Sequence, residues 1–176
     1  MNRLILAVAL TGVLGVAHAE GEITSYSKNY FDVSAGVTSS KTTVKDEDGT
    51  SNLSGTGYNL GVAYTSYQNQ HLFLQPSLQY ITTGNEAGDK YILGKLNVGY
   101  TFDLQNKYVK SISPKVGVGV YRVGYDGGSN YGIGYSAGLE VGVTEKVSVE
   151  LGYNYLKGKN SGNHVDLTTV ALKYKF

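Results

Sequence analysis

Apolar and polar residues alternate with a period of two in eight separate segments of this 176-residue chain. Successive side chains of a β-strand point to opposite faces, so each segment predicts a strand with one apolar and one polar face. The eight segments are residues 30–42, 57–65, 72–82, 91–102, 111–123, 131–143, 147–156 and 165–176. Because polar connectors separate them, we predict an all-β fold in which consecutive strands pair in antiparallel fashion.

The apolar faces carry a pattern that indicates a membrane. Aliphatic residues occupy the middle of these faces, and aromatic residues collect near their ends. The aromatic residues expected at one rim are Phe31, Tyr64, Tyr100, Phe102, Tyr174 and Phe176, and those expected at the other are Tyr58, Tyr80, Tyr131, Tyr153 and Tyr155. An aliphatic band between two aromatic girdles is typical of transmembrane barrels, whose polar residues line the lumen. We therefore predict an eight-stranded antiparallel up-and-down transmembrane β-barrel; a soluble lipocalin-like barrel or sandwich is the alternative.

The N-terminal segment has the three parts of a secretory signal peptide. Arg3 provides a positive charge, residues 4–16 form a short apolar run, and Ala17-His18-Ala19 is a small-x-small cleavage site. The apolar run is shorter than the roughly 20 residues that a membrane-spanning helix needs. We therefore expect residues 1–19 to be cleaved off and residues 20–176 to form the barrel.

The composition argues against some other classes of protein. The formal net charge is only +1, so the basic excess expected of a nucleic-acid-binding protein is missing. The sequence contains no cysteine, and neither a disulfide nor a lipid-modified cysteine can therefore stabilise or anchor the chain.

The connectors predict how the barrel sits in its membrane. Loops at one rim are expected at residues 43–56, 83–90, 124–129 and 157–164, and turns at the other rim at residues 66–71, 103–110 and 144–146. The longer loops of such barrels lie outside the cell, so we predict that the N and C termini are periplasmic. Loop 43–56, with Asp46, Glu47 and Asp48, would be the most prominent external feature.

Four charged residues are predicted to point into the lumen, namely Lys95, Lys115, Glu140 and Glu150. If residues 144–146 form a three-residue turn, Glu140 lies directly opposite Glu150, and like charges in that arrangement are destabilising. Lys115 on the neighbouring strand is the natural counter-ion. Because side chains fill the interior of an eight-stranded barrel, we predict that these residues plug the lumen as an ion-pair network; a polar path for protons or small ions is the alternative.

The last strand is predicted to close the barrel against the first strand. Its outward row consists of Val170, Leu172, Tyr174 and Phe176. Its inward residues include Lys173 and Lys175, which parity places near Asp32 across the closing seam. An ion pair across this seam is therefore expected.

The signal peptide, the eight strands, the inward charges and the terminal Tyr174-x-Phe176 together resemble a known family. They are similar to the small eight-stranded outer-membrane proteins of Gram-negative bacteria, namely the transmembrane domain of OmpA and the OmpX/Ail group. The resemblance implies an outer-membrane location and a non-enzymatic role in outer-membrane integrity or in surface interaction such as adhesion. A porin-like channel for small solutes or ions is the alternative. The terminal strand resembles the signal that the outer-membrane assembly machinery recognises.

Catalysis and metal binding have little support in the sequence. Two eight-stranded families are lipid A-modifying enzymes, and the one constellation to consider here is His164 with Ser161 and Asp166. The deacylase pattern is His-x-Ser, whereas this chain has His164-Val165-Asp166, so an enzyme is the less favoured reading. His71 is far from His164 in the sequence, and no metal-ligand spacing is present. We expect no catalytic residue, no metal and no cofactor.

The expected partners follow from the membrane location. They are outer-membrane lipid and lipopolysaccharide, the assembly machinery through the last strand, and a host or surface ligand through the external loops, while the sequence leaves open whether loops 43–56 and 157–164 bind anything; we expect no nucleic acid and a monomer. Parity places Arg122 on the lipid side near the outer rim, where it could reach lipopolysaccharide phosphates. A bulge that turns Arg122 inward is the alternative.

Overall fold

The computed structural model describes residues 29–46, 49–84, 89–104, 106–125, 128–158 and 163–176, so the predicted signal peptide lies outside the described residues. The described residues contain nine strands: β1 (Tyr30–Asp46), β2 (Gly49–Tyr67), β3 (Leu72–Thr82), β4 (Lys90–Tyr100), β5 (Phe102–Asp103), β6 (Ser111–Tyr125), β7 (Gly128–Gly142), β8 (Val147–Lys157) and β9 (His164–Lys175). Strand β5 continues β4 after Thr101, and both pair with β6. The two therefore count as one stave of an eight-stranded barrel.

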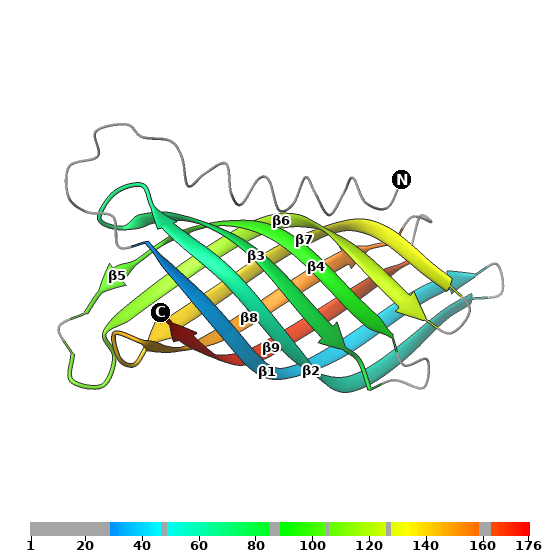
Figure 1. Cartoon of the computed structure of the whole chain (residues 1–176). Helices are drawn as coiled ribbons and strands as arrows, with labels where there is room; N and C mark the ends of the chain where they lie inside the picture. The colour runs from blue at the N-terminus through cyan, green and yellow to red at the C-terminus, as the bar shows by residue number, and fades with distance from the viewer. Residues whose placement is uncertain (1–28, 47–48, 85–88, 105, 126–127, 159–162) are drawn as a thin grey trace.

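The sheet closes on itself. Its order is β4-β3-β2-β1-β9-β8-β7-β6-β5, and an additional pairing of β4 with β6 joins the two ends. Every pair is antiparallel, and each strand lies beside its neighbours in sequence (Figure 1). The first strand and the last strand pair from Asp32–Lys175 to Thr43–His164. The predicted eight-stranded up-and-down barrel is confirmed. No helix among the described residues is long and apolar enough to cross a membrane.

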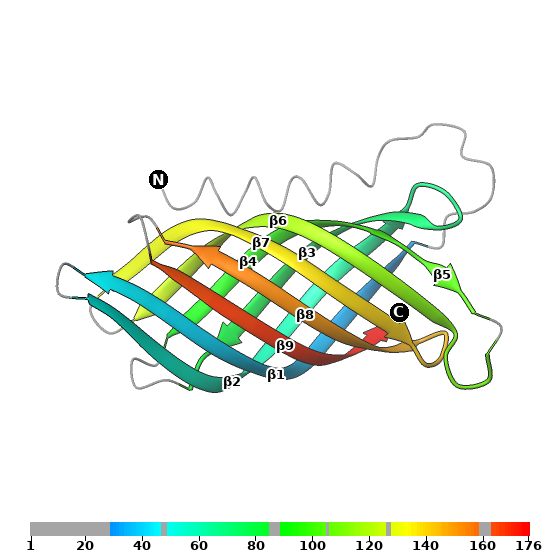
Figure 2. The same ribbon diagram turned by 180° about the vertical axis from the view of Figure 1, so that it is seen from behind.

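The two rims of the barrel differ in what they carry. The chain enters β1 and leaves β9 at the same rim, which we call the terminal rim (Figures 1 and 2). The β1–β2, β3–β4, β6–β7 and β8–β9 connections lie at the opposite rim, which we call the distal rim. The tightest turn at the terminal rim is closed by the Val143 N–H, which donates to the Val147 carbonyl over 2.9 Å.

Two predicted loops are wrong, because strands occupy most of them. Strands β1 and β2 remain paired as far as Asp46 and Gly49, so residues 43–46 and 49–56 of the predicted loop 43–56 form a strand hairpin. Strands β6 and β7 remain paired as far as Tyr125 and Gly128, within the predicted loop 124–129. Serine, threonine and asparagine can adopt an extended backbone when a partner strand satisfies the backbone hydrogen bonds. Polar composition therefore gave no strand signal for these paired residues.

The apolar faces point outward along the whole barrel. Large aliphatic side chains such as Val116, Val120 and Leu172 are more than half exposed, whereas Asn59, Asn97 and Thr169 on the opposite faces are buried. This arrangement inverts a water-soluble fold and fits a surface that lipid covers. The predicted outward faces are confirmed.

Adjacent strands approach each other closely enough to require glycine at some positions. An added Cβ at Gly36 would lie 2.0 Å from the Val170 carbonyl oxygen, and one at Gly119 would lie 2.1 Å from the Gly94 carbonyl oxygen. Both contacts are with backbone that cannot move aside. Glycine at these two positions therefore allows paired strands to approach closely.

Candidate functional site: the barrel lumen

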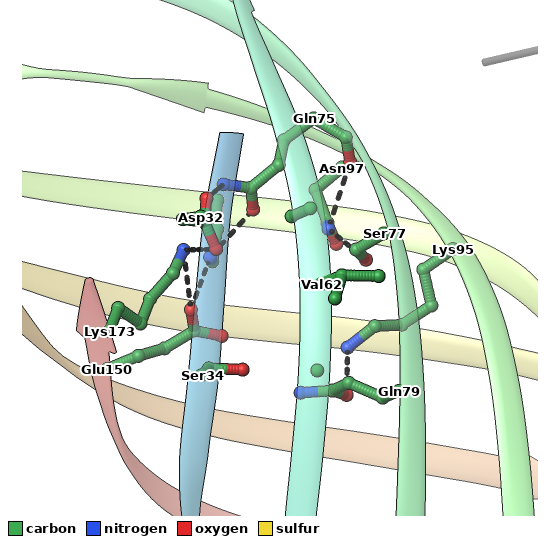
Figure 3. A pocket seen from close by; sticks show the side chains of 13 residues that line it. Asp32, Ser34, Val62, Gln75, Ser77, Gln79, Lys95, Asn97, Glu150 and Lys173 are labelled. Atoms are coloured by element: carbon green, nitrogen blue, oxygen red, sulfur yellow. Dashed lines mark hydrogen bonds and ion pairs between the residues drawn. The ribbon is translucent and has the colours of Figure 1, made fainter. Parts of the chain in front are cut away.

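Lys173 is the centre of an ion-pair network in the lumen. Its Nζ lies 2.8 Å from Glu140 Oε2, 3.2 Å from Asp32 Oδ1 and 3.2 Å from Glu150 Oε2. The Lys173 side chain is 2% exposed, so these contacts are made away from bulk solvent. A single ammonium thus joins β9 to β1, β7 and β8 across the interior. Figure 3 shows Lys173 with two of its partners, Asp32 and Glu150.

Lys115 provides a second cation for the same carboxylates. Its Nζ lies 2.7 Å from Glu150 Oε2 and 3.7 Å from Glu140 Oε2, and it donates to Gln75 Oε1 over 2.9 Å. Glu140 and Glu150 are directly opposite in the β7–β8 register, as the three-residue turn implies. The two lysines offset the repulsion between these carboxylates.

Lys175 extends the network toward the terminal rim. Its Nζ lies 2.8 Å from Glu140 Oε1 and 4.9 Å from the centre of the Tyr30 ring. The Ser148 hydroxyl donates to the same Glu140 oxygen over 2.8 Å. We call Asp32, Lys115, Glu140, Glu150, Lys173 and Lys175 the ionic layer.

Lys95 lies beside the ionic layer without joining it. Its Nζ donates to Gln79 Oε1 and to Asn154 Oδ1, both over 2.9 Å, and no described carboxylate lies within ion-pair distance. Of the four residues predicted to form the network, the structure therefore brings Lys115, Glu140 and Glu150 together and places Lys95 among amides. Four lysines thus face three carboxylates in the described lumen.

A second, apolar layer fills the lumen nearer to the distal rim. It consists of the inward side chains Ile81, Tyr91, Leu93, Tyr121, Leu156 and Leu167, with Val123 and Val165 packed against them. The Tyr121 hydroxyl donates to the Lys157 carbonyl over 2.8 Å, which satisfies its one strongly polar atom. The sequence pattern does not indicate this layer, because its members are single apolar residues on otherwise polar inner faces.

Aromatic side chains line the terminal end of the interior. The ring of Tyr67 lies 6.4 Å from that of Tyr30 and 5.6 Å from that of Phe73, measured between centroids. The Tyr67 hydroxyl is hydrogen-bonded to the Thr101 hydroxyl over 2.9 Å. A cavity lined by Asp32, Gln75 and Lys173 has a volume of about 20 Å³, which is room for about one water molecule.

Arg122 points outward from β6. It pairs in register with Ile92 on one side and Tyr131 on the other, and the regular pairing leaves no bulge that would turn it inward. Its guanidinium carbon lies 5.8 Å from the centre of the Tyr131 ring. The guanidinium therefore sits at the level of the distal aromatic girdle.

The last strand closes the barrel as its parity suggests. The outward row is exposed to the surroundings of the barrel, and it consists of Val170, Leu172, Tyr174 and Phe176. The Phe176 N–H donates to the Phe31 carbonyl over 2.9 Å, so the terminal residue itself is bonded to β1. The rings of Tyr174 and Phe176 meet edge to face at 5.1 Å.

The two histidines of the described residues lie in separate environments. His164 Nε2 lies 3.6 Å from Asp166 Oδ2, and Asp166 also accepts a hydrogen bond from the Tyr153 hydroxyl. Ser161, the nucleophile considered with them, lies outside the described residues. His71 is at the terminal rim, where its Nδ1 lies 3.0 Å from the Thr101 carbonyl oxygen. Within the described ranges no group of three or more His, Cys, Asp or Glu residues could hold a metal ion.

Comparison with known proteins identifies the family. Residues 6–176 match the model of the outer membrane protein beta-barrel domain. The chain therefore belongs to this family of outer-membrane β-barrels, which is found in Gram-negative bacteria. No curated protein sequence matches the chain significantly.

Solved structures agree with this assignment at the level of fold. Neisserial surface protein A is 19% identical with a TM-score of 0.57, and the match covers 83% of this chain and 97% of that chain. The attachment invasion locus protein Ail of Yersinia pestis is 21% identical with a TM-score of 0.50, covering 84% of this chain and 99% of Ail. The outer membrane enzyme PagL is 16% identical with a TM-score of 0.56, covering 81% of this chain and 98% of PagL. One barrel fold thus serves an enzyme as well as surface proteins.

Proposed function

We propose that this protein is a non-enzymatic outer-membrane barrel with a closed lumen, and that it contributes to outer-membrane integrity or to interactions at the cell surface. The observation that carries the proposal is the double filling of the interior. The ionic layer holds its charges by contacts as short as 2.7 Å, and the apolar layer packs several fully buried side chains behind it. An ion crossing the barrel would have to displace both layers.

The proposal places the distal rim outside the cell and both termini in the periplasm. The distal rim carries the long β1–β2 hairpin and the connection from Lys157 to His164. Surface ligands would therefore meet these segments first. The names of Neisserial surface protein A and of Ail, an attachment invasion locus protein, point to the same side of the membrane.

The outer surface of the barrel suggests two further partners. Arg122 is exposed beside the distal girdle, where a guanidinium can bind a phosphate of lipopolysaccharide through two parallel hydrogen bonds. The row that ends in Tyr174 and Phe176 is exposed and would be available to the assembly machinery before the barrel closes. The protein is proposed to act as a monomer, because its outward faces present a surface suited to lipid.

A lipid A-modifying activity is the less favoured alternative. Asp166 shares its carboxylate between Tyr153 and His164, and no described serine is hydrogen-bonded to His164. A nucleophile needs a base within hydrogen-bond reach. Mass spectrometry of lipid A from cells with and without the protein should show identical species; a deacylated or acylated product that depends on the protein would contradict the proposal.

Planar-bilayer recording tests the closed lumen. Purified full-length protein, inserted at a density verified by fluorescence, is expected to give no stable unit conductance in 1 M salt. A reproducible conductance step would instead support the small-solute or ion channel. The outer-membrane barrel itself would stand in either case, because it rests on the fold and the family.

A further inference from the structure

Lys95 carries a charge that no described carboxylate neutralises. Four lysines face three carboxylates in the described lumen, and the contacts of the ionic layer engage all three of these carboxylates. Lys95 bonds instead to the amide oxygens of Gln79 and Asn154. Because amides are neutral, they orient the ammonium but leave one positive charge uncompensated. An unpaired ammonium is costly where water is excluded, so the described lumen is short of one negative charge.

The surroundings of Lys95 offer that charge little water. Leu93 is the next inward residue of β4 toward the distal rim, and Leu156 follows Asn154 in the same way on β8. Both leucines belong to the apolar layer. Lys95 therefore lies at the boundary between the ionic layer and the apolar layer, where bulk solvent cannot take the place of a counter-ion.

The cavity lined by Asp32, Gln75 and Lys173 also borders Lys95, and we call it the Lys95 cavity. Its volume is about 20 Å³, and two further cavities of about 10 Å³ border Lys95 as well. Figure 3 shows Lys95 and Lys173 reaching the Lys95 cavity from opposite sides. Three lysines and two carboxylates line this cavity, so the excess of positive charge is present at the cavity itself.

The Lys95 cavity also contains hydrogen-bond donors that lack acceptors. The Gln79 oxygen accepts from Lys95, and the Gln79 amide nitrogen forms no hydrogen bond with a described residue. The Ser34 hydroxyl lines the same cavity and has no described partner either. An ammonium has three N–H donors, and described oxygens accept only two from Lys95. Unused donors and an unpaired positive charge together suit an anion.

We propose that the Lys95 cavity binds one small monatomic anion, chloride, between Lys95, Gln79 and Ser34. Its single charge balances the lumen, and a sphere accepts hydrogen bonds from any direction. The volume is close to that of one water molecule, which is too small for a carboxylate or a phosphate. Asp32 and Glu150 in the cavity wall have their own cation in Lys173, so they do not compete for Lys95.

The proposed anion goes beyond the proposed function, because its binding does not depend on which rim faces the outside. It would be taken up from the medium when the barrel closes and would then stabilise the folded state. Binding to the folded state alone lowers the equilibrium constant for unfolding. The stability of the barrel should therefore depend on the anion in which it is folded.

Refolding in different salts tests the anion site in the full-length protein. The protein would be refolded and unfolded with urea in detergent micelles, in the sodium salts of chloride, bromide or methanesulfonate. Equal concentrations of about 0.15 M give equal screening of surface charges. Methanesulfonate has the same charge as the halides but is too large for the cavity. Lys95→Met removes the site, and Lys90→Met is the matched control, because Lys90 is an exposed lysine of the same strand.

The equilibrium constant for unfolding of the parent protein is expected to be at least about tenfold lower in chloride or bromide than in methanesulfonate. Lys90→Met should keep this difference, whereas the three salts should agree within about twofold for Lys95→Met. Equal constants for the parent protein in all three salts would mean that Lys95 is neutral or only hydrated, and would overturn the inference. The same halide effect in Lys95→Met would also overturn it.

Anomalous scattering from bromide gives a second measurement that needs no variant. Crystals of the parent protein refolded in sodium bromide should show an anomalous peak in the lumen, in contact with Lys95 Nζ. Density without an anomalous signal at that position would identify a water molecule and contradict the proposal. Bromide found only on the outer surface would contradict it as well.

Discussion

The two layers that fill the lumen use different interactions for the same task. The ionic layer gathers three carboxylates and two further lysines around Lys173, which is the one lysine of the layer that contacts all three of Asp32, Glu140 and Glu150. The apolar layer spreads its packing over side chains such as Leu93, Leu156 and Leu167, none of which is central. Removing one side chain of the ionic layer should therefore lower the free energy of unfolding strongly when it leaves a buried charge without a partner. Removing one side chain of the apolar layer should lower it in proportion to the volume removed.

The largest effect is expected for Lys173→Met. This substitution leaves Asp32 without its cation, and removing one partner of a buried ion pair costs about 3–5 kcal/mol. Urea unfolding of the protein in detergent micelles measures the change. Lys175→Met is the control, because Lys175 is more exposed and contacts a single carboxylate. Equal losses for the two variants would show that Lys173 is not the centre of the layer.

A smaller effect is expected for Leu156→Ala in the apolar layer. Leu156 is fully buried, and such a truncation costs about 2–4 kcal/mol through lost burial and the cavity left behind. Leu151→Ala on the same strand faces outward, where lipid can fill the space, so it should cost clearly less. If the two variants were equally stable in the same unfolding experiment, the layer would not be tightly packed.

Lys95→Met should have a modest effect on stability. The variant compares a lysine that contacts only amide oxygens with Lys173, which contacts carboxylates. Lys95 bonds only to the amide oxygens of Gln79 and Asn154, so its loss strands no described carboxylate. We expect a change of about 1–2 kcal/mol for the unpaired amide oxygens. A loss as large as that of Lys173→Met would mean that Lys95 shares the charge of the ionic layer.

The smallest effect on stability, about 1 kcal/mol, is expected for deletion of Phe176, which removes one hydrogen bond to Phe31 and an exposed ring. The deletion should slow assembly more than it lowers stability, because the assembly machinery is proposed to bind the outward row of the last strand before the barrel closes. Insertion rates into bilayers that contain the assembly machinery, compared with unfolding of the inserted protein, separate the two. Identical insertion rates for the truncated and complete chains would contradict this role.

The predictability of the fold and of the site differed for a physical reason. A period of two identifies which face of a strand is apolar, and it predicted the eight staves and the outward position of Val116 or Leu172. It does not specify the stagger between strands, which decides which inward side chains meet across the lumen. The position of Lys173 near Asp32 followed from the seam, but its contacts with Glu140 and Glu150 depend on that stagger.

The apolar layer and the extended hairpin are not predictable from local sequence, for related reasons. Leu93, Leu156 and Leu167 are single apolar residues on otherwise polar faces, and they form a cluster only once the barrel closes. Thr43 and Asn52 look like loop residues in the sequence, but pairing of β1 with β2 makes them a strand. In both cases long-range pairing, not local composition, decides the structure.

The central claim is that two independent layers close the lumen, and conductance of layer-specific variants tests it most directly. One variant opens the ionic layer without stranding a charge (Lys115→Ala with Glu150→Ala), a second opens the apolar layer (Leu93→Ala with Leu156→Ala), and a third combines both. We expect no conductance from the parent protein, none or rare brief openings from the single-layer variants, and stable unit conductance only from the combined variant. Stable conductance in the parent protein, or in either single-layer variant at the level of the combined one, would contradict it.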